Sequence, residues 1–66
     1  MELIINGEVR AFKKSLSVEE ILKLLSIRST RVAVELNLEI VGRKEYKKTY
    51  PAQGDRLEIV EFVGGG

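Results

Sequence analysis

Apolar and polar residues alternate on both sides of Asn6-Gly7, and this pattern predicts a β-hairpin at the start of the chain. Asn-Gly favours a two-residue type I′ turn, because both residues of that turn need a positive φ angle. Counting outward from the turn pairs Ile4 with Val9. The two faces of the predicted hairpin then carry Leu3, Ile5 and Phe12 on one side and Ile4, Val9 and Ala11 on the other.

The spacing of apolar residues then changes to that of an α-helix. Apolar side chains recur at i, i+3, i+4 and i+7 from Val18, which predicts an amphipathic helix of about three turns. Ser17 is the expected N-cap, and Glu20 completes a capping box three residues later. No glycine caps the other end, so the pattern places that end only approximately, near Ser26. The predicted buried stripe consists of Val18, Ile21, Leu22 and Leu25.

Alternation returns in the second half of the chain and predicts three more strands. Residues 31–36 and 39–41 fit the first two of them. Asn37-Leu38 lies between these strands, and a two-residue turn there would require a positive φ at Leu38. That turn and a longer loop therefore both remain open. A turn cluster at residues 51–55 leads to the final strand.

The final strand has apolar residues on both of its faces. Leu57 and Ile59 alternate toward the predicted helix, whereas Val60 and Phe62 point away from it and are expected to continue the row of Ile4. An apolar row on an uncovered sheet face indicates a binding surface, although a β-bulge would turn Phe62 inward instead. The expected docking residues are Ile4, Val60, Phe62 and Val63, with Glu58 and Glu61 as ion-pair partners for basic residues of a binding protein.

The predicted order of elements is strand, strand, helix, strand, short strand, strand. This order indicates an α+β fold, in which one helix packs across one face of a mixed sheet of about five strands. The 66 residues are expected to form one domain over residues 1–63, followed by a flexible glycine tail at residues 64–66. A domain of this size cannot enclose a deep catalytic pocket, so we expect its function at the surface or at an end.

The composition excludes several kinds of chemistry. The chain has no cysteine and no histidine, which removes thiol nucleophiles, imidazole bases, disulfides and the usual zinc ligands. No phosphate-binding glycine motif occurs, so we expect the chain itself to bind no cofactor and no metal. The net charge of +1 and the lack of a long apolar run favour neither nucleic-acid nor membrane binding, and a cytoplasmic location is expected.

A basic loop precedes the turn cluster. Arg43, Lys44, Lys47 and Lys48 surround Tyr46 in this loop. The charges fit a solvated loop, and they also fit a docking patch for an acidic partner.

Three consecutive glycines, Gly64, Gly65 and Gly66, follow the final strand. Because glycine has no Cβ atom, this tail can pass through a channel too narrow for any side chain and present a terminal carboxylate to another protein. A frayed or engineered end would give the same spacing, so both interpretations remain open from the spacing alone.

Four segments of the second half carry a family resemblance. They are residues 32–37 (VAVELN), 39–43 (EIVGR), 54–59 (GDRLEI) and 63–66 (VGGG). In this order they resemble the ThiS family, the sulfur carriers of thiamin thiazole synthesis, and the similarity covers essentially the whole chain. It implies the β-grasp, or ubiquitin-like, fold. The family often has glycine, proline and tryptophan where this chain has Leu38, Gly42 and Tyr46, and these departures affect a loop.

The resemblance also implies a function for the glycine tail. The carboxylate of Gly66 would be adenylated with Mg-ATP bound by an E1-like, ThiF-type partner enzyme and then converted to a thiocarboxylate. Gly64 and Gly65 would thread the tail into that enzyme. A sulfur donor such as a cysteine desulfurase would supply the sulfur, and a ThiG-type thiazole synthase would receive it. The chain would then be a protein cosubstrate and no enzyme.

Three other functions remain open beside this one. The small subunit of molybdopterin synthase is a sulfur carrier that resembles this fold and also ends in a glycine pair, although residues 37–43 resemble the thiazole carrier more. A ubiquitin-like modifier would be joined to lysines of target proteins. A β-grasp interaction module would bind its partner without covalent chemistry, and its tail would be inert.

Overall fold

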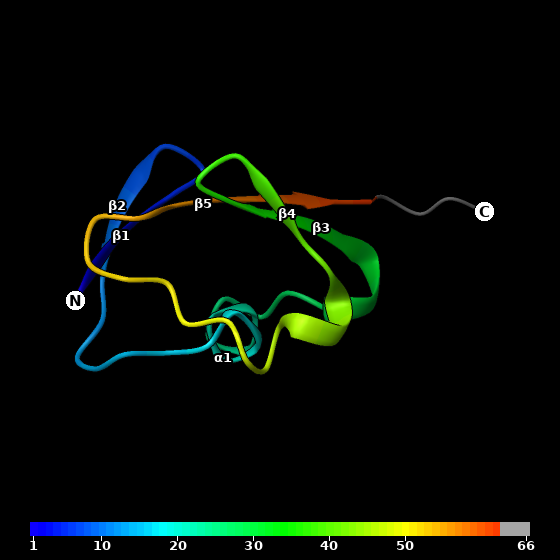
Figure 1. Cartoon of the computed structure of the whole chain (residues 1–66), viewed down its shortest axis with the longest axis horizontal. Helices are drawn as coiled ribbons and strands as arrows, with labels where there is room; N and C mark the ends of the chain where they lie inside the picture. Colours follow the sequence, from blue (N-terminus) through cyan, green and yellow to red (C-terminus); the bar gives the residue numbers. More distant parts are fainter. Residues whose placement is uncertain (63–66) are drawn as a thin grey trace.

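Five strands form one mixed sheet, and one α-helix crosses one face of it (Figure 1). The computed structural model describes residues 1–62. Its strands are β1 (Glu2–Ile5), β2 (Glu8–Ala11), β3 (Val32–Leu36), β4 (Glu39–Val41) and β5 (Arg56–Glu61), and its helix is α1 (Val18–Leu24). The sheet order is β2-β1-β5-β3-β4, in which β1 and β5 are parallel and the other neighbours antiparallel. The predicted α+β architecture is confirmed, and the predicted domain boundary at residue 63 lies outside the described residues.

The first hairpin has the turn that its Asn-Gly pair predicts. Asn6 and Gly7 have φ angles of 50° and 82°, as a type I′ turn requires. The register pairs Ile4 with Val9, and Val9 is exposed. On the other face, Leu3 is completely buried. The predicted pairing and faces of this hairpin are therefore confirmed.

Helix α1 begins where the capping box predicts. The backbone N–H of Glu20 donates to Oγ of Ser17 at 3.1 Å, and the backbone N–H of Ser17 donates to Oε1 of Glu20 at 2.9 Å. These two bonds satisfy N–H groups that have no partner within the helix. The buried residues of α1 are Val18, Ile21 and Leu22, as the apolar stripe predicts.

The helix ends earlier than the apolar spacing predicted. α1 stops at Leu24, after about two turns instead of three. Ser26 adopts a left-handed backbone with φ of 59°, a position where helices usually have glycine. The N–H of Ser26 donates to the carbonyl of Lys23 at 3.0 Å, and the N–H of Ile27 donates to that of Leu22 at 2.8 Å. These are the two bonds of a Schellman motif, so a serine takes the place of the missing glycine.

The second hairpin also has a two-residue turn. Asn37 and Leu38 have φ angles of 50° and 73°, and Leu36 pairs with Glu39, so the longer loop is not formed. The side chain of Leu38 is 82% exposed, so no burial offsets the steric cost of about 1–2 kcal/mol of its left-handed backbone. β3 begins one residue later than predicted, after the 3₁₀ turn η1 (Ser29–Arg31).

The core lies between α1 and the covered face of the sheet, and Tyr46 is part of it. Tyr46 is only 3% exposed, and burial raises the pKa of its hydroxyl. It follows the exposed 3₁₀ turn η2 (Arg43–Glu45), and all four basic residues of this loop are exposed. The loop therefore has a solvated basic surface above a buried ring. The core residues within residues 1–62 are Leu3, Ile5, Leu16, Val18, Ile21, Leu22, Val34, Tyr46, Leu57 and Ile59.

Candidate functional site

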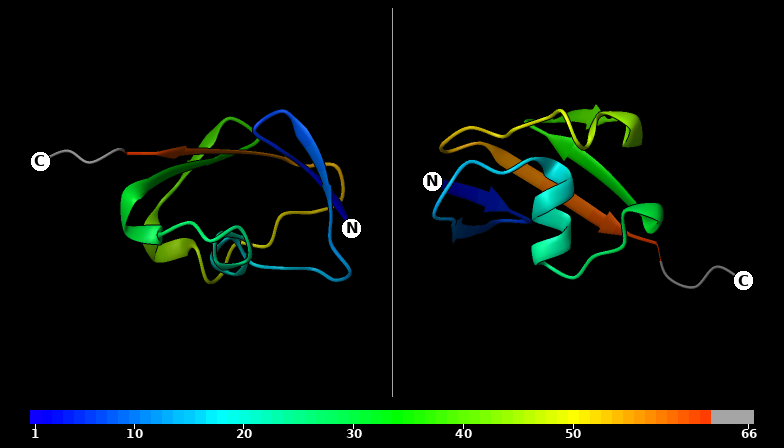
Figure 2. Two further views of the ribbon diagram at one scale, coloured as in Figure 1. Left: turned by 180° about the vertical axis from the view of Figure 1, so that it is seen from behind. Right: turned by 90° about the horizontal axis from the view of Figure 1, so that it is seen from below.

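The central strand β5 is the last element within the described residues and precedes the three glycines in the sequence (Figure 1). Leu57 and Ile59 are buried beneath α1. Val60 and Phe62 are 57% and 59% exposed, on the face of the sheet that no helix covers within residues 1–62 (Figure 2). β5 pairs with β3 without a break in register, so no bulge turns Phe62 inward. The predicted outward orientation of these two side chains is confirmed.

The outward apolar residues form two groups instead of one row. Val60 lies opposite Ala33 on β3. Ile4, by contrast, lies opposite Val9 on β2 and beside Arg56 at the start of β5. Because β1 and β5 are parallel with this offset, Ile4 and Val60 are near opposite ends of β5. The predicted continuous row is therefore wrong, and Val60 and Phe62 form a separate apolar group near the tail.

Glu58 and Glu61 lie on opposite faces of the sheet. Glu58 belongs to the outer face, where its strand partner is Glu35 on β3. Carboxylates that face each other across two strands repel, so a basic side chain of a partner protein would relieve this repulsion. Glu61 lies on the helix side and borders a pocket with Ile59. One flat interface cannot engage both of these candidate ion-pair residues.

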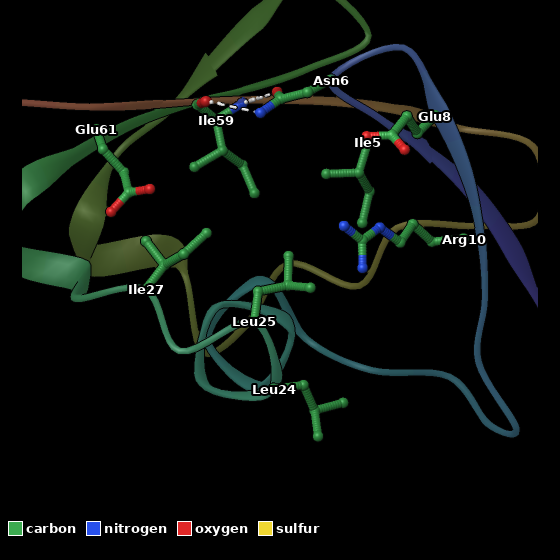
Figure 3. A pocket seen from close by; sticks show the side chains of 9 residues that line it. All are labelled: Ile5, Asn6, Glu8, Arg10, Leu24, Leu25, Ile27, Ile59 and Glu61. Atoms are coloured by element: carbon green, nitrogen blue, oxygen red, sulfur yellow. Dashed lines mark hydrogen bonds between the residues drawn. The ribbon is translucent and has the colours of Figure 1, made fainter.

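The side chain of Asn6 extends the pairing of β1 with β5. The strand β1 ends at Ile5, and the backbone N–H of Asn6 still donates to the carbonyl of Leu57 at 2.9 Å. Its amide oxygen then accepts from the N–H of Ile59 at 2.7 Å, and its Nδ2 donates to the carbonyl of Ile59 at 3.1 Å (Figure 3). The amide therefore makes both bonds to Ile59 that the backbone of β1 would make if the strand continued.

Asn37 holds the other end of β5 from the β3 side. Its Oδ1 accepts from the N–H of Arg56 at 2.9 Å, and its own N–H donates to the carbonyl of Arg56 at 2.8 Å. Sequence analysis assigned Asn6 and Asn37 to turns and missed this second role. The available signal was the residue type, because asparagine both tolerates a left-handed backbone and carries a strand-like amide.

Within residues 1–62, the last bond that fixes β5 is made by Phe62. The N–H of Phe62 donates to the carbonyl of Arg31 at 2.8 Å. β5 is therefore held by β3 on one edge up to Phe62, and by the amide of Asn6 on the other edge up to Ile59. The predicted docking residue Val63 and the predicted tail residues Gly64, Gly65 and Gly66 lie outside the described residues.

Residues 1–62 contain no cluster of three metal-binding side chains, no unpaired buried polar side-chain atom and no membrane-spanning helix. No three acidic, histidine or cysteine side chains in this part of the chain lie close enough together to hold a metal ion. Every buried polar side-chain atom described there has a hydrogen-bond partner. None of the helices in residues 1–62 has the length and apolar character needed to cross a membrane. The candidate site is the end of β5 with the surface around it, where the exposed Val60 and Phe62 lie.

Comparison with known proteins identifies the family. The profile of the ThiS family matches residues 3–66. The chain belongs to the ThiS family. The sulfur carrier protein ThiS of Bacillus subtilis is 35% identical over 65 residues, which cover 97% of this chain and 98% of that protein.

A solved structure of another ThiS protein confirms the fold. The crystal structure of the thiamine biosynthesis protein ThiS from Geobacter metallireducens superposes with a TM-score of 0.85 at 36% identity. The match covers 100% of both chains. This ThiS-family chain therefore has the β-grasp fold that the resemblance implied.

Some relatives are much longer than this ThiS-family chain. The thiazole synthase of Paramagnetospirillum magneticum is 52% identical over 66 residues, which cover 100% of this chain and 20% of that protein. The thiazole synthase of Magnetococcus marinus is 33% identical over 66 residues, again 20% of its length. The chain thus spans about a fifth of the length of these two relatives.

Proposed function

We propose that this chain is the sulfur carrier for formation of the thiamin thiazole, with the carboxyl group of Gly66 as the site of attachment. The observation that carries the proposal is the family match, which runs through the three glycines to residue 66. The sulfur carrier protein ThiS of Bacillus subtilis is similar to this chain over nearly its whole length. The described structure supports the proposal, because the last element before these glycines in the chain is the central strand of the sheet (Figure 1).

The proposed chemistry has two steps, both catalysed by partner proteins. In the first, a carboxylate oxygen of Gly66 attacks the α-phosphorus of ATP, which yields an acyl adenylate and releases pyrophosphate. An α-carboxyl group with a pKa near 3.5 is ionised at neutral pH and needs no base from this chain. In the second, the outer sulfur of the desulfurase persulfide attacks the acyl carbon and displaces AMP. A thiol of a partner protein then cleaves the S–S bond of the acyl disulfide, which leaves a thiocarboxylate and a partner disulfide. The chain has no cysteine, so the acyl-bound sulfur is carried at Gly66.

The proposed partners follow from this sequence of steps. An E1-like, ThiF-type enzyme binds Mg-ATP and performs the adenylation. A cysteine desulfurase supplies the sulfur. A ThiG-type thiazole synthase accepts it from the carrier. Two longer relatives named thiazole synthase contain a segment similar to this whole chain, and that observation favours the synthase as the acceptor.

The outer face near the tail is the proposed docking surface for the adenylating enzyme. Val60 and Phe62 are more than half exposed there, next to the residues that carry the chemistry. Glu58 and Glu35 face each other on the same surface and would accept a basic side chain of the partner. An apolar anchor with a flanking acidic pair is a small surface, which suits a carrier that must also be released.

A truncated chain tests the proposal. Removing Gly65 and Gly66 should abolish sulfur transfer in a reconstituted thiazole-forming assay, because the acyl group would lie two residues short of the active site. The fold should persist, since the core residues described all lie between Leu3 and Ile59. Circular dichroism checks the fold. A matched control, the full chain with one alanine added after Gly66, should also be inactive, and activity of either variant would reject the proposal.

A further inference from the structure

The edge of β5 that faces β1 is open at Glu61. Successive residues of a strand point their backbone groups to opposite edges. The groups of Phe62 point to β3, where its N–H meets the carbonyl of Arg31, and those of Ile59 point to the amide of Asn6. Glu61 therefore points its N–H and carbonyl to the side of β1. Within residues 1–62, neither group has a hydrogen-bond partner, because β1 ends at Ile5.

A pocket of about 390 Å³ lies directly below this open edge, between the sheet and the end of α1 (Figure 3). Its walls combine apolar side chains, Ile5 and Ile59 above and Leu25 and Ile27 below, with a larger share of polar surface. Three charged side chains surround these walls. They are Glu8, Arg10 and Glu61, and none of them forms a salt bridge within residues 1–62.

We propose that the open edge at Glu61 and this pocket together form a strand-addition site for an extended segment of the adenylating enzyme. The segment pairs with the N–H and carbonyl of Glu61, in the position that β1 would occupy if it continued beyond Ile5. One large apolar side chain of the segment enters the pocket. A basic side chain beside it meets the carboxylates of Glu8 and Glu61. This inference rests on the proposed function, because the enzyme that acts on Gly66 is the protein brought to this end of the molecule.

The geometry favours an extended segment over a helix or a small molecule. The two unpaired groups of Glu61 belong to a β-strand, and an extended backbone is the partner that satisfies both together. Side chains of such a segment alternate between the two faces of the sheet, and those on the helix side enter the pocket. Two carboxylates and one guanidinium surround the pocket, so its charge favours a basic flanking residue.

The position of the site gives it a distinct role in the proposed reaction. Glu61 lies five residues before Gly66. An enzyme segment paired at Glu61 fixes where the tail begins without touching the glycines themselves. The outer docking face at Phe62 lies on the opposite side of the sheet from the pocket. The enzyme would therefore contact the end of β5 at three places. These are the strand edge at Glu61, the outer face at Phe62 and the pocket on the helix side.

Amide hydrogen exchange provides the first test. In the free protein the N–H of Glu61 should exchange much faster than that of Phe62, which is bonded to Arg31 and serves as an internal reference. In the complex with the cognate adenylating enzyme and Mg-ATP, the Glu61 amide should become protected at least tenfold. A saturated complex in which exchange at Glu61 is unchanged would overturn the proposal.

A pair of variants at Glu61 provides the second test. Both Glu61→Ala and Glu61→Pro remove the carboxylate, but only proline also removes the N–H. Proline is tolerated there because this N–H makes no bond within residues 1–62. Relative to Glu61→Ala, Glu61→Pro should bind the enzyme about tenfold more weakly while both variants keep the same circular dichroism spectrum. Equal affinities would contradict strand addition. If Glu61→Pro unfolds, the exchange measurement on the natural chain decides alone.

The outcomes separate this inference from the proposed function. If the enzyme adenylates Gly66 but leaves the Glu61 amide unprotected, only the strand-addition site is wrong. If the enzyme neither binds nor adenylates the chain, the proposed function itself fails. Protection that appears with rising concentration of this chain alone would identify a second copy as the occupant, and would also overturn the proposal.

Discussion

At the scale of single residues, two asparagines help to position the strand that precedes the tail. Asn6 and Asn37 each occupy a left-handed turn position and each bond to β5, at Ile59 and Arg56 respectively. The side chain of Asn6 makes two bonds and that of Asn37 makes one. Ile59 is buried and Arg56 is exposed, so water can replace the bond to Arg56 more easily.

This difference predicts the effect of two matched substitutions. Glycine keeps the positive φ at either site and removes only the amide. Asn6→Gly should lower the free energy of unfolding by about 1–3 kcal/mol, because it leaves both backbone groups of Ile59 without their partners. Asn37→Gly should cost less than half as much. Urea denaturation of the three proteins measures both effects, and an equal loss in the two variants would contradict this account of Asn6.

Ser26 provides a substitution that should stabilise the protein. Its φ of 59° is strained for serine and favourable for glycine. Ser26→Gly should raise the free energy of unfolding by about 0.5–1 kcal/mol. Ser26→Ala is the control, because it keeps the Cβ atom and should give no gain. Thermal unfolding of both variants tests the prediction, which is wrong if glycine is no better than alanine.

Glu20 should make part of the stability depend on pH. The hydrogen bond from the backbone N–H of Ser17 lowers the pKa of Glu20 below its usual value of 4.5. A carboxyl whose pKa is lower in the folded state contributes stability above its unfolded pKa and loses it as the pH falls through the folded pKa. Glu20→Gln cannot titrate, so its unfolding free energy should fall less steeply with acid. Equal slopes below about pH 4.5 would contradict this.

Among single residues, turns and helix caps could be predicted from the sequence. Contacts between segments that are distant in the sequence could not. The Ser17 capping box and the Asn6-Gly7 turn depend on neighbours in the chain, and both are confirmed. The bonds from Asn6 to Ile59 join residues 53 apart, and no sequence pattern indicates them. The left-handed backbone of Ser26 accompanies the two Schellman bonds at the helix end, and the residue type does not indicate it.

At the scale of elements, the alternation of apolar and polar residues correctly predicted the sheet face of the side chains of β5. It did not predict which strands lie next to each other. The outward orientation of Val60 and Phe62 follows from the two-residue period of β5 and is confirmed. The continuous apolar row failed because it also required the offset between β1 and β5. That offset places Ile4 beside Arg56, and it depends on the pairing of two strands that are far apart in the sequence. The sequence therefore predicts which face a residue lies on better than which strand lies next to it.

The separation of the two apolar groups yields a controlled test of the docking surface. Phe62→Asp places a charge in the group near the tail and should weaken binding to the adenylating enzyme by about 2 kcal/mol, if Phe62 is a central anchor. Val9→Asp places the same charge in the other group and should leave the affinity unchanged. Calorimetric titration compares them. A larger loss with Val9→Asp would move the interface to the β1–β2 hairpin.

At the scale of the whole molecule, the fold delivers one end of the central strand to a partner. β5 lies between β1 and β3, and bonds on both edges hold it up to the last residues before the glycines. The β-grasp fold was predictable because each element is short and locally specified, and the solved ThiS structure confirms it. The proposed chemistry rests on the family resemblance, because glycine runs carry no chemical signature of their own.

One measurement tests directly whether sulfur is attached at Gly66. The intact chain is incubated with its cognate adenylating enzyme, Mg-ATP and a sulfur donor, and its mass is determined by electrospray mass spectrometry. The account predicts the exchange of one oxygen for sulfur, which fragmentation assigns to Gly66, and no exchange when ATP is omitted. An unchanged mass after complete turnover of ATP, or sulfur found on any other residue, would contradict the account.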